Sequence, residues 1–302
     1  MTSVVKNLIE KQIIKPEKFI EDNTHYEVIM GSVAYGISDD TSDLDIYGFC
    51  IPPKFYIFSH LAGEIQGFGK QHKRFDQYQK HGISYPDGKA GKGQIIDLNI
   101  YNIVKYFDLC LSCNPNMIDS LFVPQRCVLH CSRIGNMVRE NRRSFLNKSA
   151  FHRYKSYAYS ELNRIKNSKP KEGSKREKLI DTFGYDTKNA CNVVRLADQA
   201  QQILTEGDLD LERNREQLKS IRRGEWKFEQ IQDYFTSREE ELNTLYNESK
   251  VIPNRPDEEK IKQLLLNCLE EHYGKLDDSH VAVNDKYFKA FREIQEIVDK
   301  NR

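Results

Sequence analysis

The segment from Gly31 to Asp45, GSVAYGISDDTSDLD, constrains the fold more than any other part of the chain. It follows a run at residues 27–30 whose apolar and β-branched residues are typical of a strand. A glycine lets the backbone approach a ligand closely, and the free N–H groups of a helix that starts there favour an anion. The pattern therefore predicts a strand, then a phosphate-holding turn at Gly31 and Ser32, then a short helix.

Two carboxylates, Asp43 and Asp45, stand at the start of a second predicted strand, residues 44–51. Because side chains alternate along a strand, we expect both carboxylates on one face, and such hard oxygen ligands suit Mg²⁺. A third predicted strand, residues 94–100, holds a single acidic residue, Asp97, whose charge needs partners or a metal. We expect all three to be catalytic and to bind two Mg²⁺ ions, with Mn²⁺ as an alternative.

The pattern of apolar residues changes along the chain at about residue 145. Before it lie the short strands, together with a polar stretch at residues 67–93 that predicts a long loop or an excursion hairpin. After it, apolar residues at spacings of three and four predict helical segments at 181–204, 261–269 and 287–298. We therefore predict an α+β fold, with a mixed sheet and helices in residues 1–145 and an all-helical domain in residues 146–302.

No stretch of the chain reaches the roughly 18 to 20 continuous apolar residues that a membrane helix needs. The first residues, MTSVVKNLIEKQIIK, predict an amphipathic helix rather than a signal peptide. The expected location is the cytoplasm, with no membrane partner.

Seven cysteines are an odd number in a chain of 302 residues, which is long enough to build a core without disulfides, so reduced thiols are expected. Four of them have roughly the spacing of a zinc site: Cys110, Cys113, Cys127 and Cys131. The alternative is that Cys110 and Cys113, which lie in an apolar helical pattern, pack as small core residues.

Positive charge is concentrated in residues 133–178, although the net charge of the chain is only +1. That segment holds fourteen Lys and Arg residues against four Glu, a local net charge of +10, and tyrosines are interleaved with them. Such a surface suits a polyphosphate or nucleic-acid backbone. The alternative is a solvated helix followed by a charged connector.

One predicted helix carries a polar face opposite its apolar face, formed by Tyr185, Lys188, Asn192, Arg195 and Gln199. Lys188 and Arg195 are two turns apart and could reach the phosphates of a nucleotide bound by the first domain, as could Tyr185 at the start of the face. The alternative is a stripe that faces solvent.

Gly-Ser, followed after about ten residues by Asp-x-Asp, resembles the DNA polymerase β superfamily of nucleotidyltransferases. More narrowly, the chain is similar to a bacterial and phage family of predicted nucleotidyltransferases, some of which are associated with RNA ligases. The similarity spans about residues 25–230. It is carried by three blocks: GSVAYGISDDTSDLDIYG, IYNIVKYFDLCLSCNPNMIDSLF, and FGYDTKNACNVVRLADQAQQILTEG followed by SIRRGEW.

The resemblance implies roles for individual residues. Gly31 and Ser32 match the triphosphate-holding turn, Asp43 and Asp45 the metal-binding pair, and Asp97 the third carboxylate. The family's motif positions that flank the site correspond to Tyr35, Gly36 and Ser42 in this chain. Asp119 stands where the family has Glu, and Asn189 and Asn192 stand where it has His, so no proton-transfer role is carried over to those positions.

Together these features predict transfer of a nucleoside monophosphate from a nucleoside triphosphate to an acceptor hydroxyl, with release of pyrophosphate. An RNA or tRNA end is the favoured acceptor. Two alternatives within the enzyme class are a protein hydroxyl, as in antitoxin-like superfamily members, and a small molecule such as an aminoglycoside. A third is a non-catalytic module that binds nucleotide or RNA. The preferred base and the oligomeric state are left open.

Overall fold

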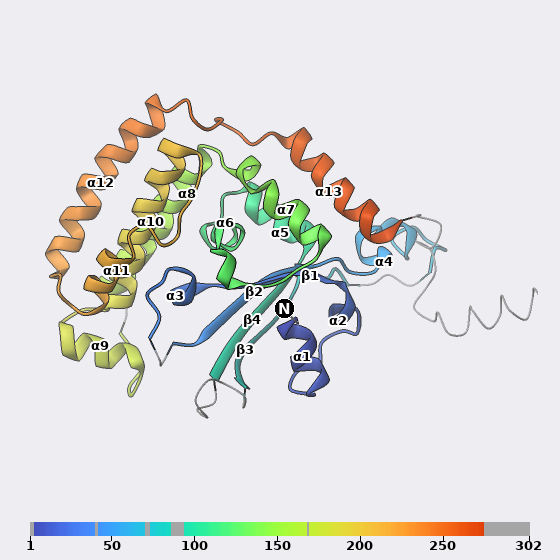
Figure 1. Ribbon diagram of the computed structural model, residues 1–302, viewed down its shortest axis with the longest axis horizontal. Helices are drawn as coiled ribbons and strands as arrows, with labels where there is room; N and C mark the ends of the chain where they lie inside the picture. Colours follow the sequence, from blue (N-terminus) through green and yellow to red (C-terminus); the bar gives the residue numbers. More distant parts are fainter. Residues whose placement is uncertain (1–2, 40–41, 70–72, 86–93, 168, 275–302) are drawn as a thin grey trace, which may run out of the picture.

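The structure is a computed structural model, and it describes residues 3–39, 42–69, 73–85, 94–167 and 169–274. A mixed sheet lies beside a layer of helices, and the later helices form an arc around it (Figure 1). The predicted α+β fold is confirmed. No helix within the described ranges is long and apolar enough to cross a bilayer.

Within the described residues the sheet has five strands in the order β3-β4-β2-β1-β5. Only β2 and β4 are parallel neighbours; the other pairs are antiparallel. The strands are β1 (Thr24–Ile29), β2 (Leu44–Cys50), β3 (Gln77–Tyr85), β4 (Gln94–Asn102) and β5 (Val128–Cys131).

Two of these strands were not named from the sequence. β3 lies in the stretch at 67–93, where a loop or an excursion hairpin was expected, and it pairs with β4 at the edge of the sheet. Most of its side chains are exposed, so the apolar alternation that reveals a half-buried strand is missing. β5 is the other edge strand and has only four residues.

The helices before residue 146 are α1 (Val4–Glu10), α2 (Phe19–Asn23), α3 (Gly31–Ala34), α4 (Lys54–Ile57), α5 (Ile103–Leu111), α6 (Pro115–Phe122) and α7 (Arg133–Glu140), with short 3₁₀ turns at Ser59–Leu61, Gln125–Cys127 and Arg142–Phe145. The later helices are α8 (Ser149–Asn167), α9 (Lys175–Phe183), α10 (Thr187–Glu206), α11 (Arg215–Arg222), α12 (Phe228–Glu248) and α13 (Glu258–Tyr273).

Each face of the sheet packs against a different set of helices. Ile46 on β2 and Leu98 on β4 belong to a core with residues of α1 and α2, whereas Phe49 packs into a second core with α5 and α6. Because side chains alternate along a strand, Asp45 and Asp97 lie on the same face as Phe49. Both carboxylates therefore point toward the helical layer.

The helix predicted at 181–204 is interrupted. Gly184 adopts a left-handed conformation, φ +81°, and ends α9, as a glycine often does at this position. Asp186 then caps α10, because its carboxylate accepts hydrogen bonds from the backbone N–H groups of Lys188 (2.9 Å) and Asn189 (3.1 Å). The spacing of apolar residues alone does not show this break.

The last described helix, α13, returns to the sheet (Figure 1). It packs against α7, and Arg133 and Glu271 form an ion pair across this contact with N and O atoms 3.2 Å apart. His272 Nδ1 lies 3.0 Å from His25 Nε2 on β1, and the Tyr273 hydroxyl donates to the carbonyl oxygen of Pro52.

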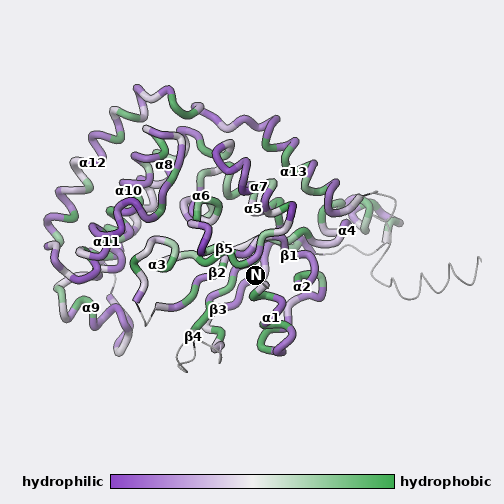
Figure 2. The backbone as a smooth tube through the Cα atoms, in the orientation of Figure 1, coloured by the Kyte–Doolittle hydropathy of each residue, from purple (hydrophilic) through white to green (hydrophobic). Residues whose placement is uncertain are grey.

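Polar and apolar residues alternate along α12 and α13, as expected for helices with one buried face (Figure 2). The helix predicted at 261–269 lies within α13, whereas the one predicted at 287–298 is outside the described residues. The division into residues 1–145 and 146–302 stays a prediction, since one hydrophobic core connects elements on both sides of it.

Candidate active site

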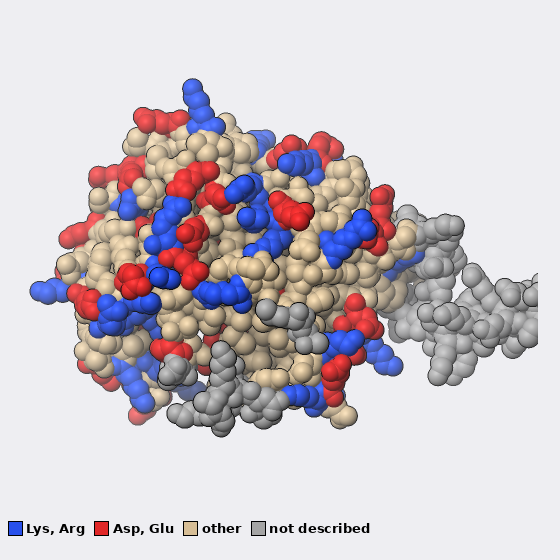
Figure 3. Space-filling model, in the orientation of Figure 1, with Lys and Arg blue, Asp and Glu red and all other residues tan. Residues whose placement is uncertain are grey.

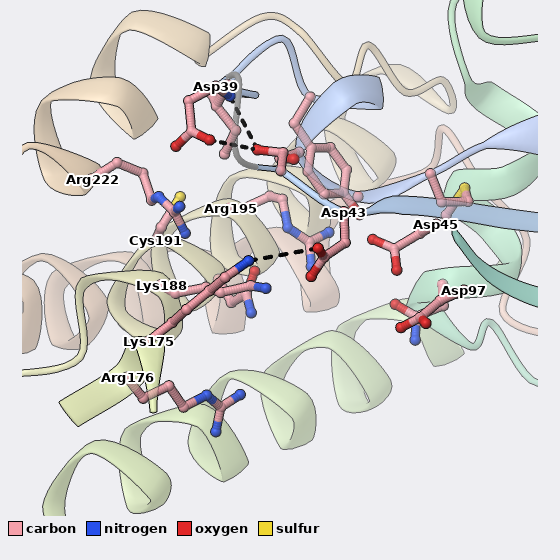
Figure 4. Close-up of a pocket in the computed structure, with 18 of the residues that line it drawn as sticks. Asp39, Asp43, Asp45, Asp97, Lys175, Arg176, Lys188, Cys191, Arg195 and Arg222 are labelled. Atoms are coloured by element: carbon pink, nitrogen blue, oxygen red, sulfur yellow. Dashed lines mark hydrogen bonds and ion pairs between the residues drawn. The ribbon is translucent and has the colours of Figure 1, made fainter. Parts of the chain in front are cut away.

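A cavity of about 490 Å³ lies between the sheet and the helices α9, α10 and α11 (Figure 4). Four aspartates line it, together with five basic residues that come from the helices. The lining residues discussed below are Gly31, Ser32, Tyr35, Asp39, Ser42, Asp43, Asp45, Tyr47, Asp97, Lys175, Arg176, Lys188, Arg195 and Arg222.

The Gly31 turn is built around the Asp45 carboxylate. Gly31 has φ +65°, and a Cβ at this position would stand 2.3 Å from Oδ2 of Asp45. The backbone N–H of Met30 also donates to the carbonyl oxygen of Asp45 at 2.7 Å, which joins the turn to β2. Only glycine allows both the left-handed backbone and this close approach.

Asp45 and Asp97 are direct neighbours, since they are paired residues in the parallel register of β2 and β4. Asp43 lies one residue before the start of β2, and it lines the same cavity as Asp45 and Asp97.

The three carboxylates have different partners. Asp43 Oδ1 lies 3.6 Å from Lys175 Nζ, whereas Asp97 accepts a hydrogen bond from the Gly82 N–H at 2.7 Å and lies 3.3 Å from Nδ1 of His81. Burial raises the pKa of the Asp45 carboxyl, and the negative charges of Asp97 and Asp43 raise it further, against the opposing effect of Lys188. A cation placed among them would relieve this repulsion.

In the described part of the chain, no three His, Cys, Asp or Glu side chains are grouped closely enough to hold a metal ion. This applies to the aspartates as they stand and also to the cysteines. Cys110, Cys113 and Cys127 are buried in the hydrophobic core, and burial raises the pKa of the Cys113 thiol to about 11, which disfavours the thiolate that zinc requires. Cys110, Cys113 and Cys127 therefore serve as core residues, and the partly buried Cys131 packs against the same core.

Basic side chains occupy the wall of the cavity opposite the strands. Figure 4 shows Lys175, Arg176, Lys188 and Arg222 on the helical side, facing the carboxylates on β2 and β4. Lys188 is exposed, and its charge acts directly on Asp45. This arrangement offers cations to an anion that is bound between the two walls.

Arg195 lies at the inner end of the cavity in a buried network. Its Nη1 donates to Oδ2 of Asp119 (2.7 Å) and to Oε1 of Gln199 (2.9 Å), and its guanidinium stacks 4.3 Å from the ring centroid of Tyr35. The Tyr35 hydroxyl donates to the same Asp119 oxygen at 2.7 Å. The alternative of a solvent-facing stripe is therefore wrong for this helix face, since Arg195 and Gln199 are buried.

Two of the residues expected at the site do not line the cavity. The Tyr185 hydroxyl donates to the carbonyl oxygen of Trp226 at 2.6 Å, away from the carboxylates. Gly36 faces the turn before α11, where a Cβ would stand 2.8 Å from Oε1 of Glu212. Ser42 does line the cavity, and its hydroxyl donates to Oδ1 of Asp39 at 3.1 Å.

Some lining residues were not assigned to the nucleotide site from the sequence. Lys175 and Arg176 belong to the basic run at 133–178, for which the expectation was a polyphosphate or nucleic-acid backbone, or else a solvated helix and a charged connector. Arg222 lies in the SIRRGEW block, which contributes to the resemblance, but the resemblance assigned no role to this residue. Tyr47 follows Asp45 by two residues on β2, so strand alternation could have placed it on the same face.

Comparison with known protein families gives a match over most of the chain. The family described as the RNA repair pathway DNA polymerase beta family matches residues 5–269. This range includes the described strands of the sheet, the cavity and most of α13. No curated protein matches the chain significantly.

Proposed function

The chain belongs to the RNA repair pathway DNA polymerase beta family, and from that premise we propose that it transfers a nucleoside monophosphate from a nucleoside triphosphate to an acceptor hydroxyl, releasing pyrophosphate. The observation that carries the proposal is the cavity itself, in which carboxylates on two paired strands face basic side chains across a glycine turn. The acceptor that we propose is the end of an RNA or tRNA.

The basic wall and the glycine turn would hold the triphosphate. Lys188 and Arg222 donate to phosphate oxygens, and Lys175 does so when it turns from Asp43, its present partner. Gly31 and Ser32 line the cavity beside the Asp45 carboxylate, where their backbone would lie close to the phosphates. The triphosphate thus lies between the carboxylates and the helices.

The carboxylates fit divalent cations by the chemistry of their oxygens, although they are not yet arranged around one point. Asp43, Asp45 and Asp97 would hold two Mg²⁺ ions, or Mn²⁺, after Asp43 and Asp97 leave their present partners. When bound, the ions offset charge on the triphosphate and lower the pKa of the acceptor hydroxyl. Burial, together with the negative charges of Asp97 and Asp43, raises the pKa of the Asp45 carboxyl, and a cation here would offset both effects.

Tyr35 would act as a positioning residue. It directly follows α3, the helix that begins at Gly31, and its backbone N–H donates to the Gly31 carbonyl oxygen at 3.2 Å. Because its hydroxyl is held by Asp119 and its ring by Arg195, the turn is fixed to both α6 and α10. The reacting groups therefore meet in a geometry that the fold supplies before the substrate arrives.

The test uses the purified full chain with labelled nucleoside triphosphates and Mg²⁺, offered total RNA or total protein as acceptor. Wild-type protein should label RNA, and Asp43→Asn or Asp45→Asn should each lower turnover about 100-fold or more, because a charge that faces the reaction is lost. Asp233→Asn, an exposed aspartate on α12, is the matched control and should keep full activity. Full turnover in both active-site variants, or labelling of protein alone, would refute the proposal.

A further inference from the structure

A second cavity, of about 260 Å³, adjoins the active-site cavity on the far side of Arg176. It lies between the end of α8, the segment that leads into α9, and the start of α10. Four basic side chains line it, from Arg164, Lys169, Lys171 and Arg176. Arg176 lines both cavities, so a ligand in one is next to a ligand in the other.

The charges in the second cavity favour an anion. Its only acidic lining residue is Asp186, whose carboxylate already accepts two backbone hydrogen bonds at the start of α10 and lies 3.6 Å from Nε of Arg176. Lys169 and Lys171 are exposed, and neither forms an ion pair with an acidic residue of the described chain. Two ammonium groups are thus available to a ligand.

This local excess of positive charge contrasts with the rest of the basic run at 133–178. Several of its cations are neutralised by acids from other segments, as in the pairs Arg143–Asp208, Lys155–Glu239 and Arg133–Glu271. Figure 3 shows the outcome on one face of the molecule, where Lys and Arg are interspersed with Asp and Glu. On this face no broad basic surface is seen. The second cavity keeps an excess of positive charge from Lys169 and Lys171, although Arg164 is paired with Glu161 at 2.6 Å and Arg176 with Asp186.

We propose that the second cavity binds a backbone phosphate of the RNA acceptor, next to the nucleotide whose hydroxyl reacts. The proposal rests on the function proposed above, and it names the part of the acceptor that this chain recognises. Ammonium and guanidinium groups donate to the non-bridging oxygens of a phosphodiester, which fixes a strand in place without reading its bases.

A polymer explains two adjoining cavities better than a small acceptor does. The first cavity holds the carboxylates and must receive the triphosphate and the reacting hydroxyl. The second has no available carboxylate and adds cations, which a strand of linked phosphates uses and an isolated sugar or protein hydroxyl does not. We therefore expect recognition that tolerates changes of sequence but weakens steeply with salt.

The test compares two double variants of the full chain. Lys169→Ala with Lys171→Ala removes the two available cations, and Lys15→Ala with Lys18→Ala removes two exposed lysines from the segment before α2 as a matched change of charge. Binding of a labelled single-stranded RNA is followed by fluorescence anisotropy over a range of salt concentrations. The cavity variant should raise Kd about tenfold. It should also lower the slope of log affinity against log salt by about 0.7, the value for one phosphate on a single strand. The control should match wild type.

Transfer assays separate this inference from the proposed function. In the cavity variant, KM for RNA should rise about tenfold while KM for the nucleoside triphosphate stays unchanged. If wild type binds RNA through the cavity but transfers no nucleotide, the inference stands and the proposed function fails. If transfer to RNA occurs with wild-type KM for RNA and an unchanged salt slope in the cavity variant, the inference fails alone. An equal loss in the control pair, or a matching rise of KM for the triphosphate, also overturns it.

Discussion

Replacing Asp119 with alanine should destabilise the protein far more than an ordinary core substitution. Asp119 is 0% exposed, and one of its carboxylate oxygens accepts hydrogen bonds from both Arg195 and Tyr35 at 2.7 Å. In Asp119→Ala the guanidinium of Arg195, which is only 8% exposed, keeps Gln199 as an acceptor but loses its counter-charge. The variant therefore leaves an uncompensated charge inside the protein.

The magnitude follows from that geometry. Removing one partner of a buried ion pair costs about 3–5 kcal/mol, and a hydrogen bond to a charged group contributes about 1.5–3 kcal/mol. Because the two effects share one oxygen they do not add, and we expect a loss of about 4 kcal/mol for Asp119→Ala. Tyr35→Phe, which removes only the hydroxyl, should cost about 1.5 kcal/mol.

Urea unfolding followed by circular dichroism measures both losses as changes in the free energy of unfolding. A double-mutant cycle with Arg195→Met isolates the pair, since the double variant removes both charges and should be markedly more stable than the sum of the single losses predicts. A loss below about 1 kcal/mol in Asp119→Ala, or a double variant whose loss equals that sum, would refute the reasoning.

Two further predictions concern single positions. Gly31→Ala should lower nucleotidyl transfer at least about tenfold, because the added Cβ displaces the Asp45 carboxylate. The control is Gly184→Ala, which has a similar φ and no atom within 4 Å of the added Cβ, and it should show only the backbone cost of about 1 kcal/mol in urea unfolding. Equal transfer activities of the two variants would contradict this prediction. Burial, together with the charges of His272 and His130, lowers the pKa of His25 from 6.5 to about 4. Between these pH values the unfolded chain therefore binds more protons than the folded chain does. The contribution of His25 to the free energy of unfolding is full above about pH 6.5 and is lost as pH falls toward 4. This loss in the free energy of unfolding should reach at most about 3 kcal/mol. The free energy of unfolding should change less between pH 7 and pH 4.5 in His25→Gln than in wild type. An identical change in both proteins would exclude His25 as the cause.

The sequence predicted those parts of the molecule that depend on neighbouring residues. β1, the Gly31 turn and β2 follow one another within a short segment, so local spacing and a single glycine identify them. β3 could not be identified in the same way, because an edge strand is stabilised by pairing on one side and does not need an apolar face.

The environment of Arg195 illustrates a different limit. Its helical spacing correctly placed it on the face with Lys188, yet its partner Asp119 lies 76 positions away in the sequence. Nothing in the local pattern shows that a carboxylate and a tyrosine hydroxyl meet there, since that contact depends on how α6 and α10 pack. The basic run at 133–178 shows the same limit, because the acids that neutralise it come from distant segments.

The return of α13 to the sheet restricts how the helices around the cavity can move. The helical segment is fastened at both of its ends, by the backbone at residue 146 and by the contacts of His272 and Tyr273 with β1 and Pro52. A hinge of the kind that opens two lobes linked at one point would have to break these contacts. The helices that line the cavity are therefore tied to the sheet at both ends of the helical segment, and a wide hinge opening is disfavoured.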